Sequence, residues 1–480
     1  MSEKNVSFSG RFYTITSYFI HALFFTSQNL LYGNTPYYIH LLATRYTLIK
    51  ADNLIKYLRI MNHLKYSKKN SKSFIWHSVF LALTKNLADI NTVIPTMLIQ
   101  AGGTPFHLGI LTSIMIGGSK FMNIFFAAFL THKEKTRKYL LFGIYLRVGA
   151  LLILGYLLSF AGEMEGKYVI GFILLLMTIF SFSGSFAGIA YNDILGKSIN
   201  ADSRKRFFIL KQILASTAVL ASALVARKIL TIYSYPLNYS ILFILSGLLL
   251  FIGSGGFWVI REQVSTVSES LKLSKKFALF WESLVKDKTL RNYLYAVNTT
   301  SLGIAIIPFL IALAKKNFGL TGADIGNYLL LQVIGMMLAN LLFKFLSKGQ
   351  GYKGIMTIHI MSGALLPVAA LLLQNNQNLF MILFPLSGLV LASREIAIPG
   401  ILLEISNDKN RAIYTGISGA GGIATIIFPI AAGALISLIG FNLVFIVTSL
   451  FVVSSFIFST KIECPRSIEP DNVNKTLSNK

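Results

Sequence analysis

The chain alternates between long apolar stretches and short polar segments. A helix needs about 20 mostly apolar residues to cross the hydrocarbon core of a bilayer, and twelve stretches of this kind can be found. They predict helices over 74–98, 107–130, 139–160, 168–191, 206–230, 239–260, 290–314, 323–345, 355–373, 378–398, 411–437 and 441–460. The longest segment between them, 261–289, follows the sixth stretch. The pattern therefore predicts six helices, a charged linker and six more helices.

Composition places these helices in a membrane. Hydrophobic residues make up 54% of the chain and charged residues 13%, whereas soluble domains carry about 25% charged residues. The mean hydropathy is +0.64. These values exclude a soluble globular protein and a disordered one, and they favour an all-α membrane protein. Cys464 is the only cysteine, which excludes an internal disulfide and a cysteine metal cluster.

The basic residues indicate how the chain is oriented. Lys and Arg number 44 against 19 Asp and Glu, an excess that in a soluble protein would suggest nucleic acid. Here the loops on one side of the predicted membrane carry nearly all of the basic residues, and the loops on the other side hold Lys167, Lys315 and Lys316. The positive-inside rule then predicts a multi-pass protein of the plasma (inner) membrane with both termini and the linker in the cytoplasm. We expect no nucleic-acid partner.

The two sets of six helices share sequence. Displacing the chain by about 200 residues aligns the second helix with the eighth and the loop after the fourth helix with the loop after the tenth. The matched pairs are Thr104/Thr321, Gly109/Gly326, Gly118/Gly335, Asn123/Asn340, Ile194/Ile401, Leu195/Leu402, Asn200/Asn407 and Arg204/Arg411. A duplicated six-helix unit is typical of many secondary transporters.

The expected domains follow from this layout. They are a basic N-terminal extension (1–73), a six-helix half (74–260), a cytoplasmic linker (261–289), a second six-helix half (290–460) and a cytoplasmic tail (461–480). The extension is cytoplasmic or lies at the membrane interface, where its basic residues would attract anionic lipid. An equally open alternative is that residues 1–60 are a mis-started N-terminus and that Met61 is the natural start.

Residues 74–460 resemble the major facilitator superfamily of transporters. The resemblance rests on the six-plus-six layout, the inside linker, the glycines of the second and eighth helices, and the basic loops. The family's run G-x-x-x-D-R-x-G-R-K corresponds to FLTHKEKTRKYLL, where Arg137 and Lys138 match but Lys133 replaces the Asp and Thr136 a Gly. The Asp-based gate is therefore not carried over, and no subfamily is identified. The resemblance implies alternating access around a site near the bilayer midplane.

Polar residues inside the spans are the candidates for that site, because a charge there is costly. Lys85 and Asp89 are four residues apart, so a helix would place them on one face as an ion pair. With Asn86 they are candidates for binding substrate or coupling protons, and the alternative is a pair that only fixes packing. Asn298 lies in the equivalent helix of the second half.

Further charged residues suggest two more roles. Lys120 and Arg147 would suit an anionic group of a substrate, although Arg147 could equally reach toward the headgroups. Residues at the predicted inside ends are candidates for a cytoplasmic gate, with solvation at the surface as the alternative reading. They are Asp193, Arg204, Arg394, Glu395 and Arg411. The histidines inside spans, His77 and His359, are expected to be packing residues.

These features predict a secondary active transporter that moves a small solute by alternating access with coupling to protons. A lipid or amphiphile flippase or exporter on the same fold, and a non-transporting membrane sensor, remain alternatives. Catalytic and nucleotide-binding motifs are missing from the sequence. We therefore expect no enzyme activity, cofactor or metal, and we expect a monomer in the lipid bilayer.

Overall fold

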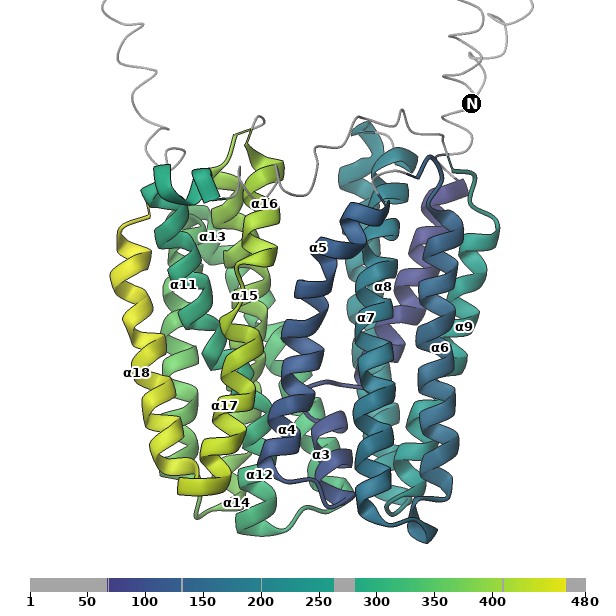
Figure 1. Cartoon of the computed structure of the whole chain (residues 1–480), viewed down its shortest axis with the longest axis vertical. Coiled ribbons are helices and arrows are strands. Elements are labelled where there is room, and N and C mark those ends of the chain that lie inside the picture. The colour runs from purple at the N-terminus through teal and green to yellow at the C-terminus, as the bar shows by residue number, and fades with distance from the viewer. Residues whose placement is uncertain are drawn as a thin grey trace, which may run out of the picture. The chain divides into compact units, whose positions relative to one another are not determined.

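The computed structural model describes residues 67, 69–130, 133–199, 201–262, 281–407 and 410–462, which belong to one compact unit (Figure 1). These residues form helices and no strand. The helices are 69–87, α3 (Val93–Gln100), α4 (Pro105–Thr112), η2 (Ser113–Gly118), α5 (Ser119–Leu130), α6 (Arg137–Ser159), η3 (Ala161–Glu163), α7 (Gly166–Ser198), α8 (Ala201–Ile232), α9 (Leu237–Trp258), 281–286, α11 (Lys288–Ala305), α12 (Ile307–Phe318), α13 (Gly322–Leu373), α14 (Gln377–Phe380), α15 (Leu383–Ile405), α16 (Arg411–Ala420), α17 (Ala424–Ile439) and α18 (Phe441–Thr460). Nearly all of the predicted N-terminal extension lies outside the described residues.

Ten helical segments among the described residues are long and apolar enough to cross a membrane, which confirms an all-α multi-span protein. Gly351, with φ 60° and ψ −161°, divides α13 into two of these segments, Gly322–Phe345 and Gly351–Leu373. The first two predicted spans are not among the ten because each is interrupted. The chain leaves the helix at 88–92, and α4 passes into α5 through the π-helical turn η2.

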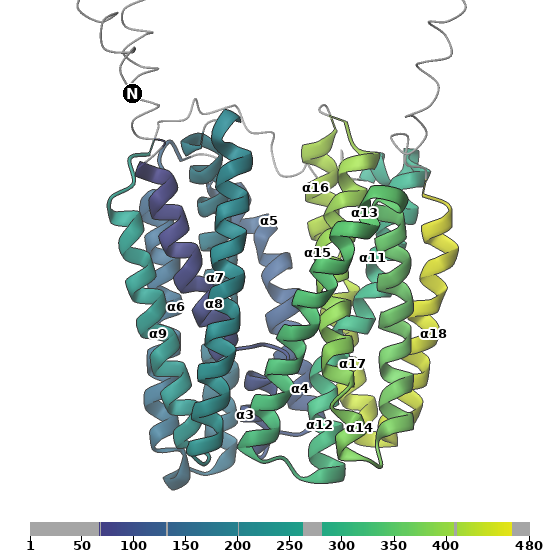
Figure 2. The same cartoon turned by 180° about the vertical axis from the view of Figure 1, so that it is seen from behind.

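The helices gather into two bundles. The N-terminal bundle comprises helix 69–87 and α3 to α9, and the C-terminal bundle comprises α11 to α18. Figures 1 and 2 show them side by side, purple to teal and teal-green to yellow. The bundles touch where α4 and η2 pack on α17, where α8 packs on α13, and where α12 packs on α3 and α4. In both views the bundles lie closest together at the end that holds α3, α12 and α14.

The repeated threonines begin equivalent helices. Thr104 is the N-cap of α4: its hydroxyl accepts from the backbone N–H of His107, whose ring accepts from the Thr104 N–H. Thr321 caps α13 in the same way, with Asp324 as the reciprocal side chain. Each cap satisfies donors that the first helical turn would otherwise leave unpaired. The sequence match therefore reflects the same local structure in both bundles.

The repeated glycines lie where the bundles cross. A Cβ atom on Gly109 of α4 would lie 2.3 Å from the carbonyl oxygen of Pro429 on α17. A Cβ atom on Gly326 of α13 would lie 2.8 Å from the Cα of Arg227 on α8. Both glycines thus permit backbone contact between the bundles, which is how small residues act in packed membrane helices.

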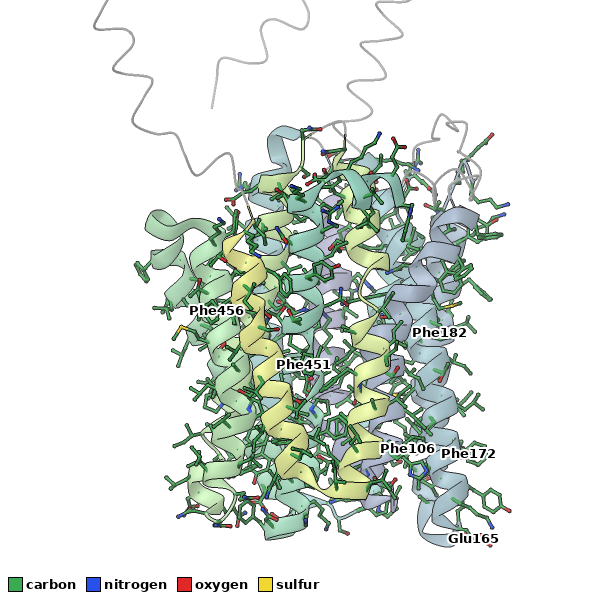
Figure 3. All side chains as sticks on the ribbon, turned by 60° about the vertical axis from the view of Figure 1, so that its left-hand side comes forward. Phe106, Glu165, Phe172, Phe182, Phe451 and Phe456 are labelled. Carbon is green, nitrogen blue, oxygen red and sulfur yellow. The ribbon has the colours of Figure 1, made fainter. Side chains whose placement is uncertain are left out.

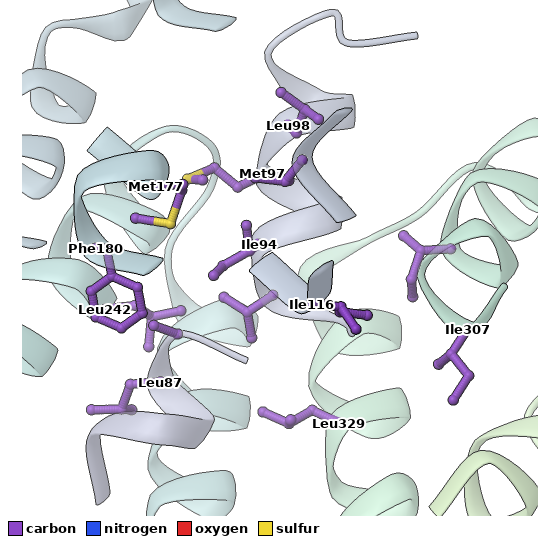
Figure 4. Packing of buried hydrophobic residues seen from close by; sticks show 14 of the residues in the cluster. Leu87, Ile94, Met97, Leu98, Ile116, Met177, Phe180, Leu242, Ile307 and Leu329 are labelled. Atoms are coloured by element: carbon purple, nitrogen blue, oxygen red, sulfur yellow. The ribbon is translucent and has the colours of Figure 1, made fainter. Parts of the chain in front are cut away.

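The buried apolar residues form two clusters. The larger cluster joins the bundles, and Figure 4 shows Leu87, Ile94 and Phe180 of the N-terminal bundle with Ile307 and Leu329 of the C-terminal bundle. The smaller cluster lies wholly within the C-terminal bundle. It is built from α11, the second segment of α13 and their neighbours. The bundles therefore share one apolar core at one end and pack separately at the other.

The outer surface is apolar, as lipid contact requires. Phe172 on α7 and Phe451 on α18 are exposed, and Figure 3 shows both on the outside of the helices. Exposed large apolar side chains continue along α6, α8 and α9. In water such a surface would drive association, whereas in a bilayer it faces hydrocarbon.

Candidate functional site

The interruption of the first span is built around Asp89. Its Oδ1 atom accepts from the backbone N–H groups of Asn91 (3.0 Å) and Thr92 (2.8 Å) and from the Thr92 hydroxyl (2.8 Å). Asp, Asn and Thr side chains commonly bond nearby backbone groups in this way instead of continuing a helix. The first helix therefore ends at 87, and α3 begins at Val93.

The predicted Lys85–Asp89 ion pair is wrong. The prediction assumed a continuous helix, but the helix ends between the two residues. Among the described residues the salt bridges are Lys167–Glu165, Lys197–Asp193 and Lys286–Glu282. The Lys85 side chain is exposed, and its charge acts instead on Lys211 of α8.

Asp89 also links the two bundles. The side chain of Gln332 on α13 lies close enough to the Asp89 carboxylate to interact with it. Gln332 is 2% exposed, and its Oε1 accepts from the Ser387 hydroxyl of α15 at 3.4 Å. A polar chain therefore runs from the interruption of the first span into two helices of the opposite bundle. The buried Oδ1 of Asn91 lies beside it without a hydrogen-bond partner.

Two asparagines hold equivalent helix pairs together. Asn86 donates from Nδ2 to the carbonyl of Val219 on α8 at 2.6 Å. Asn298 of α11 donates to the carbonyl of Gly421 at 2.8 Å and accepts from the N–H of Ala424 at 3.1 Å, so it bridges the gap between α16 and α17. Both side chains therefore satisfy backbone groups, and both bonds lie within one bundle.

Lys120 and Arg394 approach each other from opposite bundles. Lys120 of α5 packs against the α16–α17 gap, where its Cδ lies 3.8 Å from the position of a Cβ on Gly422. Its charge is close enough to Arg394 of α15 for the two to repel. Arg394 was predicted near the inside end of its helix, but α15 continues past 398 to Ile405. Arg394 therefore lies in the middle of the helix.

Arg147 lies between α6 and α7. Its guanidinium stacks over the Phe180 ring at 4.3 Å, and its buried Nε has no hydrogen-bond partner. Gly184 leaves room for it, since a Cβ there would lie 3.2 Å from Nε. The cation–π contact partly offsets the cost of holding this charge inside the bundle.

Asp193 and Glu395, the other described gate candidates, interact within their own bundles. Asp193 of α7 pairs with Lys197 and accepts from the Thr136 hydroxyl at 2.8 Å. Glu395 is exposed beside Arg394, and no salt bridge joins them. The side chains of Arg204 and Arg411 lie outside the described part of the structure.

Glu262 belongs to this region although the sequence pattern did not indicate it. Its carboxylate accepts from the backbone N–H groups of Thr136 (2.6 Å) and Arg137 (2.9 Å), at the start of α6. A carboxylate at a helix N-terminus is favourable because the helix dipole is positive there. The contact joins segments that are more than a hundred residues apart, so local sequence gave no signal for it.

The two histidines are buried and hydrogen-bonded. His77 Nδ1 lies 3.3 Å from the carbonyl of Gly253, and its ring packs on Phe257 with centroids 4.5 Å apart. His359 Nδ1 lies 3.1 Å from the hydroxyl of Ser393. Within the described ranges, His, Cys, Asp and Glu form no group that could hold a metal ion.

One hollow of about 350 Å³ lies between α5, α6 and α7. Its lining is mainly aromatic and aliphatic and includes Phe126, Phe142, Phe182 and Phe186. A second hollow, of about 370 Å³, lies beside Trp76 and Gly256, between helix 69–87 and α9. Both belong to the N-terminal bundle.

The sequence model of the Major Facilitator Superfamily matches residues 294–476, and no curated protein sequence gives a significant match. The fold is similar to three solved structures that cover 81–82% of this chain and 96–100% of their own. They are the nucleoside transporter NupG (TM-score 0.59, 12% identity), a POT family transporter in complex with 5-aminolevulinic acid (0.60, 12%) and a bacterial homolog to the human lysosomal transporter Spinster, inward-facing and unoccupied (0.54, 12%). At these identities the likeness establishes the fold.

Proposed function

We propose that this chain is a secondary active transporter of the Major Facilitator Superfamily. The family's sequence model matches residues 294–476, and the described residues share the fold of solved transporters. The protein moves a small solute by alternating access, and it couples that movement to protons. In this fold, two bundles rock around a central site near the bilayer midplane.

The proposed topology has twelve spans. The stretches 69–100 and 105–130 cross the membrane in addition to the ten segments that are long and apolar enough to span it. Both termini lie in the cytoplasm of a plasma-membrane protein, because the basic loops lie on that side. With this orientation the spread end of the bundles faces inward.

Cys464 provides a test of the topology, since it is the only cysteine and lies in the tail, outside the described residues. An impermeant thiol reagent should leave it unlabelled in intact cells and label it after permeabilisation. Labelling in intact cells would reverse the proposed orientation.

The proton-coupling proposal rests on the position of Asp89. Its carboxylate is the group of the first-span interruption that can bind a proton, and Gln332 of the opposite bundle interacts with it. Protonation removes one acceptor and the negative charge, which weakens the N–H bonds that define the interruption. Movement of the bundles changes the Gln332 contact in turn. Proton affinity and bundle position are then linked, as coupled transport requires.

The experiment uses the full chain in proteoliposomes that contain a pH-sensitive dye, screened with a panel of nucleosides, short peptides and organic anions. A solute that drives proton entry identifies a transported substrate. Asp89→Asn retains size and hydrogen bonding but does not titrate, so it should abolish proton-driven uptake of that solute. Exchange of labelled for unlabelled solute requires only binding and rocking, and it should persist.

Asp324→Asn is the matched control. Asp324 also caps a helix and also interacts with a glutamine, accepting from Gln377 at 2.9 Å, but its hydrogen-bond partners, Thr321 and Gln377, lie in one bundle. Proton-driven uptake should survive this substitution. If Asp89→Asn accumulates solute as well as the parent with the same pH profile, Asp89 is structural and the coupling proposal is wrong.

A lipid or amphiphile flippase is the second candidate. The apolar hollow between α5, α6 and α7 favours it, because aromatic and aliphatic walls suit an acyl chain better than a polar solute. Transfer of a fluorescent phospholipid between leaflets of the same proteoliposomes, together with failure of every soluble compound to move protons, would favour this candidate over the first.

A further inference from the structure

We propose that Lys120 and Arg394 form an anion-binding site between the two bundles, and that the solute carries a carboxylate or phosphate group. This inference rests on the proposed transport function and names the substrate class of the central site. The charge balance of the spans, the positions of the two cations and their surroundings support it.

The interior of the described spans carries more positive than negative charge. The charged residues away from the loops are Lys85, Lys120, Arg147, Lys211, Arg394, Asp89 and Glu395. None of them takes part in a salt bridge within the described part of the chain. Unpaired charges inside a membrane protein are costly, and they persist where a ligand or ion neutralises them.

Lys120 and Arg394 are the cations of this group that come from different bundles and interact electrostatically. Lys85, Arg147 and Lys211 all belong to the N-terminal bundle. Lys120 extends from α5 to the α16–α17 gap of the other bundle, next to Gly422. Both side chains are partly buried, and the charge of Arg394 acts on Lys120.

The surroundings supply polar groups but no countercharge that bonds to either cation. The hydroxyl of Tyr293 lies near Arg394 and bonds to the Ile398 carbonyl (3.2 Å) and the Ser418 hydroxyl (3.0 Å). Asn298 bonds to the edges of the gap that Lys120 contacts. Glu395, adjacent to Arg394 in the chain, is exposed; its charge acts on Arg394, but no salt bridge joins the two. An anion between Lys120 and Arg394 would bind two charge-assisted donors from opposite sides.

Such an anion would also affect the position of the bundles. Without it, the like charges of Lys120 and Arg394 oppose close approach of α5 to α15. A carboxylate or phosphate between them converts this repulsion into attraction to a shared partner. Solute binding then favours the state in which the bundles are closer, because that state holds the anion with both cations.

The test measures ligand-induced thermal stabilisation of the whole protein in phosphatidylcholine nanodiscs at constant ionic strength. The probes are succinate with its neutral counterpart succinamide, and glycerol 3-phosphate with glycerol. We expect at least one anion to raise Tm with a saturable concentration dependence, and neither neutral compound to do so. Lys120→Gln and Arg394→Gln should each weaken the apparent Kd by about tenfold or more, since each removes one charged donor.

Three comparisons control for misfolding and for general charge effects. Lys120→Arg keeps the charge and should bind within a few-fold of the parent. Lys211→Gln makes the same charge change within one bundle and should leave the apparent Kd unchanged. The unliganded Tm of each variant shows whether it is folded. If a Gln variant is misfolded, the comparison of Lys120→Arg and Arg394→Lys with Lys211→Gln decides the result.

The proposal is overturned if neither anion stabilises the protein, if the neutral counterpart stabilises it equally, or if stabilisation survives both Gln substitutions. It is also overturned if phosphatidylglycerol in the nanodisc reproduces the effect and the soluble anions do not, because the anionic group then belongs to lipid. Anion binding without any proton-driven flux would contradict the proposed function and leave this site intact. Flux of neutral solutes alone would support the proposed function and contradict this anion site.

Discussion

The first spanning helix of the N-terminal bundle and that of the C-terminal bundle are both interrupted partway along. In the N-terminal bundle, the carboxylate of Asp89 collects the N–H groups of 91 and 92 and also contacts the opposite bundle. In the C-terminal bundle, α11 passes into α12 at Ile306 through backbone bonds alone, and Pro308 lies in the first turn of α12. One interruption depends on an ionisable side chain, and the other depends on proline and apolar packing.

This difference shows how a duplicated unit can divide its roles. Both copies retain the shape of an interrupted first helix, so that shape is a property of the fold. The N-terminal copy places a titratable group in the interruption, and the C-terminal copy provides the partner, Gln332, from its second helix. Under the proposed coupling, a proton would bind in one bundle and change the contact with the other.

The largest expected effect separates the two interruptions directly. Asp89→Ala removes the acceptor of three hydrogen bonds and leaves buried donors unpaired, which should lower the free energy of unfolding by about 3 kcal/mol. Pro308→Ala removes a backbone restraint and two buried ring carbons and should cost about 2 kcal/mol. Titration with denaturing detergent in mixed micelles measures both. Equal losses would mean that the two interruptions are stabilised alike.

The crossings between bundles should respond more evenly. Gly109→Ala and Gly326→Ala each place a methyl group against backbone of the opposite bundle, and each should cost about 2 kcal/mol. Gly171→Ala on α7, where no atom lies within 4 Å of the new Cβ, should be neutral or slightly stabilising. A large difference between the two crossing variants in the same titration would show that the crossings are not equivalent.

The smallest expected effect concerns the two asparagines. Asn298→Ala loses a donated and an accepted bond at the α16–α17 gap and should cost about 2 kcal/mol. Asn86→Ala loses one hydrogen bond to the Val219 carbonyl. Because that carbonyl also accepts from Ser222, a loss of about 1 kcal/mol is expected. The order of the two losses is the measured quantity, and the reverse order would mean that the gap is held by other contacts.

Sequence alone predicted the helical membrane fold well because lipid imposes a simple rule, about 20 apolar residues for each span. It did not predict where spans are interrupted, since apolar length is insensitive to a break. Local signals did exist: Asp89, Asn91 and Thr92 all favour caps, and Gly421 and Gly422 adjoin the α16–α17 gap. The predicted Lys85–Asp89 ion pair was wrong because it assumed a helix without this interruption.

Contacts between the bundles could not be predicted from the sequence. Gln332 interacts with a residue more than two hundred positions away, and the charge of Arg394 acts on Lys120 across a similar separation. Local pattern carries no information on such pairs. The repeat analysis came closest, because it selected Gly109 and Gly326, which the structure places at equivalent crossings.

Under the proposed alternating access, α13 would tilt on α8 at one of those crossings. Gly326 lies against the Cα, Cβ and Cγ atoms of Arg227, so the side chain that must adjust there is that of Arg227. From Gly326 to Phe345, the end of the first segment of α13, the helix is about 28 Å long at 1.5 Å per residue, so a tilt of about 10° carries its far end about 5 Å. A displacement of that size equals the width of a small solute, and it requires almost no movement at Gly326.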